Sequence, residues 1–132
     1  PSQPIRLLPL LSKLKSIYLL WYNSYQILPK THRNSLGQKI DSLFVETIEA
    51  VSVATFLSKK EKTPWIRLAT RKVDTIKILL MVLWETKSID NKKYITLSVL
   101  IEEIGKMLGG WQGQIMSQLL KQNSPDTKSR EK

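Results

Sequence analysis

Residues 63–87, TPWIRLATRKVDTIKILLMVLWETK, indicate the fold class of this chain. Apolar side chains recur along this stretch at alternating steps of three and four residues, which is the period of an α-helix with one buried face. Thr63 is a suitable N-cap, and Pro64 fits the first helical position, where its missing N–H costs nothing. The stretch therefore predicts a helix whose buried positions are Ile66, Ala69, Val73, Ile76, Leu80 and Leu83.

Three further segments show the same period, so the chain predicts an all-α, antiparallel up-down-up-down four-helix bundle. Pro29 closes the first segment, because proline disfavours helical geometry in the residue before it. Ser35 with Gln38 makes a capping-box pattern at the start of the second, and Asp90 is an N-cap candidate for the fourth. The charged residues before Thr63 are interpreted as a turn. The predicted helices cover about residues 7–28, 35–58, 64–87 and 90–122.

The chain length of 132 residues fits one domain. We expect the bundle to occupy residues 1–122 and the polar, aperiodic residues 123–132 to form a disordered tail. The longest apolar run has seven residues, 78–84, which is too short to cross a bilayer. Because the first residues also lack the pattern of a secretion signal, we expect a cytoplasmic protein with no membrane partner.

Catalytic and metal-binding patterns are missing from the sequence. The absence of cysteine excludes a disulfide scaffold and a thiolate zinc site. A di-iron bundle needs Glu-x-x-His on two helices, but His32 is the single histidine and lies in a polar link. No glycine-rich phosphate loop occurs either. We expect a protein that is not an enzyme and has no metal or cofactor.

Glycines in the fourth predicted helix conflict with helix propensity. Residues 102–115, EEIGKMLGGWQGQI, contain four glycines, and each costs about 1 kcal/mol relative to alanine in a helix interior. Gly105, Gly109 and Gly113 are spaced four residues apart and line one ridge. A ridge without side chains admits a neighbouring helix, a second subunit or a nucleic-acid backbone; Leu108 and Trp111 beside it favour a helix. We predict a close helix contact at Gly105, Gly109, Gly113 and Trp111, within the bundle or between subunits.

Surplus apolar surface on the first predicted helix favours self-association. Leu7, Leu10, Ile17 and Leu20 lie beside the main seam of this helix. One core needs a single broad stripe, and additional apolar surface usually marks an interface. The sequence therefore predicts a homo-oligomer.

The charge of the chain is strongly basic. Twenty-one Lys and Arg face eleven Asp and Glu, which gives a formal net charge of +10. Such an excess attracts nucleic acid or another polyanion, although a lysine-rich surface can also serve solubility alone. Phosphate contacts are predicted at both ends of the third predicted helix, with a solvated face balanced by Glu61 and Asp74 as the alternative. The candidate cations are Lys59, Lys60, Lys62, Arg67, Arg71, Lys72, Lys92 and Lys93.

Three stretches together resemble one known family: LPKTHRNSLGQKI (28–40), LATRKVDTIKILLMVLWETKSIDNKKYITLS (68–98) and EEIGKMLGGWQ (102–112). They are similar to the four-helix-bundle proteins that include Avd, the accessory variability determinant of diversity-generating retroelements. The same broad family takes in proteins encoded within 23S rRNA intervening sequences. Lys30 and Arg33 match the first motif and join the candidate nucleic-acid contacts.

The resemblance implies a basic homopentameric ring that partners a reverse transcriptase and binds template RNA, or DNA, during mutagenic cDNA synthesis. Two alternatives stay open. One is an oligomeric structural adaptor whose charge serves an acidic protein surface. The other is a protein of the rRNA intervening-sequence type, whose biochemistry the resemblance leaves undefined.

Overall fold

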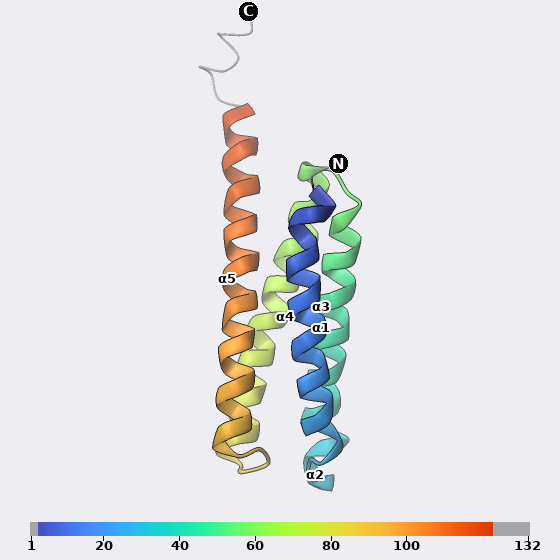
Figure 1. The fold of residues 1–132 in the computed structure, drawn as a ribbon, viewed down its shortest axis with the longest axis vertical. Coiled ribbons are helices and arrows are strands. Elements are labelled where there is room, and N and C mark those ends of the chain that lie inside the picture. The colour runs from blue at the N-terminus through green and yellow to red at the C-terminus, as the bar shows by residue number, and fades with distance from the viewer. Residues whose placement is uncertain (1–2, 123–132) are drawn as a thin grey trace, which may run out of the picture.

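The computed structural model describes residues 3–122, and no strand occurs among them. The helices are α1 (Gln3–Gln26), α2 (Lys30–Arg33), α3 (Leu36–Thr55), α4 (Lys59–Glu85) and α5 (Asn91–Gln122). The four long helices run alternately in opposite directions, as Figure 1 shows. Contacts of α1 with α3, α3 with α4, α4 with α5, and α5 with α1 close a four-helix bundle, which confirms the expected fold class. Residues 123–132, expected to be a disordered tail, lie outside the described part of the chain.

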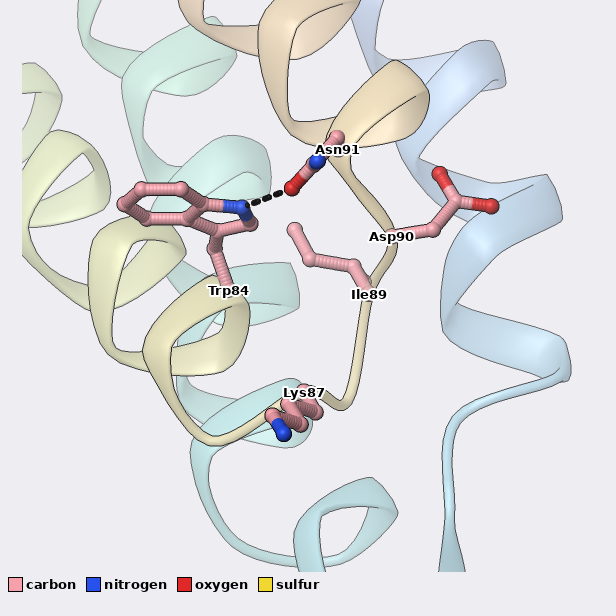
Figure 2. A pocket seen from close by; sticks show the side chains of 5 residues that line it. All are labelled: Trp84, Lys87, Ile89, Asp90 and Asn91. Atoms are coloured by element: carbon pink, nitrogen blue, oxygen red, sulfur yellow. Dashed lines mark hydrogen bonds between the residues drawn. The ribbon is translucent and has the colours of Figure 1, made fainter.

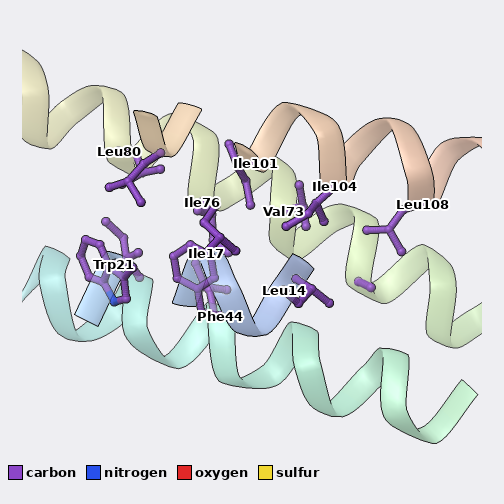
Figure 3. Close-up of a cluster of buried hydrophobic side chains, with 14 of the residues drawn as sticks. Leu14, Ile17, Trp21, Phe44, Val73, Ile76, Leu80, Ile101, Ile104 and Leu108 are labelled. Atoms are coloured by element: carbon purple, nitrogen blue, oxygen red, sulfur yellow. The ribbon is translucent and has the colours of Figure 1, made fainter. Parts of the chain in front are cut away.

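The core lies between the four long helices (Figure 3). All six apolar positions predicted within residues 63–87 have 0% exposure, which confirms the phase of this helix. Leu10 and Ile17 are also core residues, so they are not the surplus surface that the sequence predicts. Leu20 does remain 42% exposed, and the side chain of Leu7 lies outside the described residues. No helix in the described range combines the length and apolarity that a bilayer-spanning segment requires.

The start of α4 corrects the predicted boundary at residue 64. Ser58 is the N-cap: its Oγ accepts the Glu61 N–H at 3.4 Å, and Glu61 Oε1 accepts the Ser58 N–H at 3.4 Å. This reciprocal capping box turns the expected charged turn into the first helical turn. Thr63 is therefore not an N-cap, and its Oγ1 is buried without a hydrogen-bond partner among the described residues. Pro64 lies inside α4, where it has no N–H to give to the helical ladder.

The link after α1 also differs from the prediction. The short helix α2 occupies part of the segment that was expected to be a polar link. The capping box predicted at Ser35 does not form, because the Ser35 hydroxyl donates instead to the Thr31 carbonyl at 2.9 Å. Before α5, Asp90 Oδ1 accepts the Lys93 N–H at 2.8 Å, which confirms Asp90 as the N-cap of this helix.

The glycine ridge of α5 makes only part of the predicted helix contact within this chain. A Cβ on Gly105 would lie 3.2 Å from Lys77 Nζ and 3.8 Å from Val73 Cγ1 on α4. A Cβ on Gly109 or Gly113 would meet nothing within 4 Å. Intrachain packing is therefore the wrong explanation for these two glycines, because α5 presents them to open space. A contact with a second subunit stays a prediction.

Candidate nucleic-acid interface

A pocket of about 430 Å³ lies between α4 and α5 and is lined by Arg67, Thr70, Arg71 and Gln112. The two arginines are exposed and stand one helical turn apart, so their side chains project from the same face of α4. No hydrogen bond or ion pair to another described residue occupies either guanidinium. Thr70 donates its hydroxyl back to the Ile66 carbonyl at 2.9 Å. The free donors of the pocket are thus two guanidinium groups and the Gln112 amide, a set that suits an anion.

Open backbone on α5 adjoins this pocket. Gly105 faces Lys77 and Val73 of α4, and Gln112, seven residues later, lines the pocket with the arginines. Gly109 lies between these two positions on the same side of α5, since residues three or four apart are neighbours on a helix surface. A Cβ at Gly109 would meet nothing within 4 Å. The missing side chain therefore leaves the backbone of α5 exposed at this position.

The acidic residues proposed as partners for these arginines are engaged elsewhere. Glu61 caps α4 through Ser58, and the hydrogen bonds with Ser58 lower the pKa of the Glu61 carboxyl. Asp74 lies 3.9 Å from Lys77, whose ammonium also lies 3.4 Å from Glu102. The arrangement leaves the positive charge of the arginines uncompensated at close range.

Two of the other predicted cations make an ion pair or hydrogen bonds within the protein. Lys72 Nζ lies 2.7 Å from Glu46 Oε1 on α3, and this hydrogen bond lowers the pKa of the Glu46 carboxyl. Arg33 donates from Nε and Nη2 to the Leu28 carbonyl at 3.2 and 2.8 Å. It thereby fastens α2 to the end of the preceding segment. Both cations belong to the bundle's own framework as well as to its surface.

The prediction that Lys62 contacts nucleic acid is wrong. This residue is only 1% exposed, so its side chain cannot reach a nucleic acid. Its ammonium donates to the Ala54 carbonyl at 2.8 Å and lies 5.6 Å from the centre of the Trp111 ring. Burial lowers the pKa of Lys62. The spacing could have revealed this, since Lys62 precedes Ile66 by one helical turn on the apolar stripe of α4.

The remaining cations divide between the two ends of the bundle. Lys59 and Lys60 stand in the first turn of α4 at one end. Lys92 and Lys93 begin α5 at the other, roughly 40 Å away along a helix of 27 residues. A hydrogen bond between His32 Nδ1 and Ser88 Oγ joins α2 to the α4–α5 link, so Lys30 belongs to this second end.

Gln112 and Lys87 are absent from the residues that the sequence predicts for the interface. Gln112 enters it because α5 turns this position toward Arg67 and Arg71. Lys87 is exposed at the second end and has φ 65°, in the left-handed region. Gln112 depends on how α5 lies against α4, whereas Lys87 lies in the α4–α5 link, and both fall in the stretches that resemble the family.

A comparison with protein-family models matches residues 10–115 to the family described as bAvd-like. The chain belongs to the bAvd-like family. This bAvd-like match covers most of the chain and confirms the resemblance found in the three sequence motifs. It includes every residue of the arginine pocket and both ends of the bundle. No curated protein and no solved structure matches the chain.

Proposed function

We propose that this bAvd-like protein is a non-catalytic accessory protein that binds RNA and works with the reverse transcriptase of a diversity-generating retroelement. Its role would be to hold template RNA during mutagenic cDNA synthesis. The observation that carries the proposal is the pocket in which Arg67 and Arg71 stand unpaired beside Gln112. Membership of the bAvd-like family and the net charge of +10 support it.

The chemistry of the pocket suits a phosphate backbone rather than a base edge. A guanidinium engages phosphate oxygens through two parallel N–H donors, and two guanidinium groups one turn apart can grip one or two neighbouring phosphates. Contacts of this kind supply affinity and carry little sequence information. We therefore expect RNA binding that weakens with salt and tolerates changes of sequence, and single-stranded DNA should compete for the same surface.

We also propose that the protein assembles with itself, with five subunits as the expected number. Apolar side chains stand exposed on the outer faces of α1 and α4, among them Leu19, Tyr22 and Ile78. Exposed apolar side chains on these outer faces can be covered by further copies of the chain. In a closed ring each subunit would present the same arginine pocket, so the phosphate contacts would repeat around the assembly.

The test is an Arg67→Glu, Arg71→Glu double variant, compared with a Lys15→Glu, Lys39→Glu control of equal charge change on α1 and α3. We expect the arginine variant to keep its helix content and subunit number while it loses RNA affinity. The slope of log affinity against log salt should flatten by about 0.7 for each lost contact with a single-stranded phosphate. Equal affinities of the two double variants at low salt would place the interface elsewhere. Co-purification of the wild type with the reverse transcriptase, with and without nuclease, tests the partner.

A further inference from the structure

A second pocket, of about 380 Å³, lies at the opposite end of α4 and is lined by Trp84, Lys87, Ile89, Asp90 and Asn91. Figure 2 shows the Trp84 indole beside Asn91, with Ile89 and Lys87 following along the α4–α5 link. We propose that Trp84 is a stacking platform for a base of single-stranded RNA. This inference rests on the proposed function and adds to it a site where a base, and not only a phosphate, is held.

The Trp84 ring is held in place before any ligand arrives. One face stacks on Tyr94, with ring centroids 4.6 Å apart and planes inclined by 6°. Its polar edge is also engaged, because Nε1 donates to Asn91 Oδ1 at 2.6 Å. A ligand that binds a ring already fixed in this way loses little side-chain entropy, which favours affinity.

The Trp84 side chain remains partly accessible. Trp84 is 37% exposed, close to the 36% of Trp65, whereas Trp21 in the core has 0% exposure. Tyr94 covers one face of the ring, Asn91 takes the N–H, and the side chain lines the pocket. A flat aromatic group fits such a surface, and every base has a π-face, so the contact would be tolerant of sequence.

The charges around the ring favour an anionic strand over a cationic protein side chain. Lys87 lines the pocket, Lys92 and Lys93 follow it at the start of α5, and Lys30 stands at the same end of the bundle. Asp90 is the one acid in the lining, and its Oδ1 already accepts the Lys93 N–H at 2.8 Å. Glu85 is the other nearby acid, exposed at the end of α4. Around this pocket four lysines therefore face two acidic residues.

Lys87 follows the end of α4 and lines the pocket. Its φ of 65° is the left-handed conformation that commonly closes a helix. The Lys87 N–H donates to the Trp84 carbonyl at 3.0 Å and the Ser88 N–H to the Leu83 carbonyl at 2.8 Å, which is the Schellman pattern. The conformation brings the Lys87 side chain into the pocket lining, where its ammonium can neutralise a phosphate attached to the stacked base.

The two pockets can hold one strand. Trp84 follows the midpoint of Arg67 and Arg71 by fifteen residues on α4, which is roughly 20 Å along the helix. At the 3.4 Å rise per nucleotide of one strand in a duplex, about six nucleotides span this distance. The arginine pocket would then fix the backbone while Trp84 selects unpaired bases, because a base inside a duplex cannot offer its face.

The experiment measures binding of a short oligouridine and of duplex RNA of equal length to the wild type, Trp84→Leu and Trp84→Phe over a series of salt concentrations. Loss of base stacking should weaken oligouridine binding about 5- to 150-fold in Trp84→Leu, the equivalent of ~1–3 kcal/mol. Duplex affinity and the salt slope should not change, and Trp84→Phe should retain most of the affinity. Equal loss for duplex and single strand, or no loss for either, would overturn the proposal.

A second measurement needs no variant. Oligouridine with 5-iodouridine at successive positions is irradiated in complex with the wild-type protein, and the cross-linked peptide is mapped. We expect cross-links at Trp84, and cross-links confined to other residues would overturn the proposal. Oligouridine binding by the wild type that is lost in the arginine double variant but unchanged in Trp84→Leu would leave the proposed function standing and refute only the stacking site. Absence of any RNA binding by the wild type would refute both.

Discussion

Alanine substitutions at the glycines of α5 should stabilise the isolated chain. A Cβ at Gly109, Gly110 or Gly113 would meet nothing within 4 Å, so alanine adds no clash at these positions. It does remove the penalty of glycine in a helix interior, about 0.8–1.0 kcal/mol per residue. Each single variant should therefore gain close to 1 kcal/mol of unfolding free energy. The triple variant should gain roughly 2.5–3 kcal/mol if the effects add.

Urea denaturation followed by circular dichroism measures this effect. The midpoint should rise while the m-value stays constant, because the surface exposed on unfolding hardly changes. In a thermal scan the same gain corresponds to roughly 3–6 °C for each kcal/mol in a chain of this size. The measurement should be made at a concentration where the wild type is monomeric by light scattering, so that subunit contacts do not contribute.

The other two glycines provide matched controls. A Cβ at Gly37 would lie 2.7 Å from Leu28 Cδ1 and 2.9 Å from the His32 carbonyl oxygen, and the latter is backbone that cannot turn aside. Gly37→Ala should cost about 1–3 kcal/mol through overpacking. A Cβ at Gly105 would meet the flexible end of Lys77 at 3.2 Å, so Gly105→Ala should lie between these extremes.

A loss of stability in Gly109→Ala or Gly113→Ala would refute the conclusion that this ridge is open in the free chain. A different pattern identifies a subunit contact: stabilisation of the monomer together with dissociation of the oligomer. Gly109→Leu sharpens the distinction, since its side chain would lie beside the arginine pocket. We expect it to stabilise the free chain by an amount similar to alanine and to weaken RNA binding.

Substitutions at three further positions test the ionisable and capping groups. Burial lowers the pKa of Lys62 below its ordinary 10.5. Between the folded and unfolded pKa values the unfolded chain binds more protons, so the stability of the wild type rises with pH there. Urea titrations of Lys62→Met should not show this rise. Burial and the hydrogen bond with Asp41 raise the pKa of Tyr18 from 10.0 to about 12, so the folded state holds the proton more tightly and stability falls as pH rises through that interval. Tyr18→Phe should remove this fall, and an ultraviolet titration should then lack the tyrosine that ionises at about pH 12. Ser58→Ala should cost about 1 kcal/mol in thermal unfolding, whereas Ser58→Asp should restore the cap.

The bundle could be predicted because its signal is spread over many residues. The apolar stripe of α4 repeats over five turns, so no single exception could change the phase or the fold class. Helix ends depend on one or two side chains, and here two signals compete. Ser58 with Glu61 and Thr63 with Pro64 both resemble a helix start. In the structure the helix starts at Ser58, where the capping box forms and Lys62 in the following turn bonds to Ala54 of α3.

The candidate site was predictable in part for a different reason. Arg67 and Arg71 share a face through local spacing alone, which the sequence contains. Gln112 joins them only because α5 is rotated to bring that residue against α4, and rotation about a helix axis is a property of the whole core. The burial of Lys62 is similar, since its partners come from α3 and α5. Charge alone does not reveal whether a lysine faces solvent or a carbonyl.

Pro64 gives the two ends of the bundle different ways of coming apart. Because it has no N–H, the Lys60 carbonyl lacks its usual helical donor, and the first turn of α4 is tied to the rest of the helix by fewer backbone bonds. The Lys62 ammonium fastens this turn to Ala54 on α3 and lies over Trp111 on α5. Opening of this one turn would break the contacts with α3 and with α5 together, so local unfolding at that end would begin with this turn. The turns of α4 and α5 at the end that carries Trp84 contain no proline, so no backbone donor is lost in them.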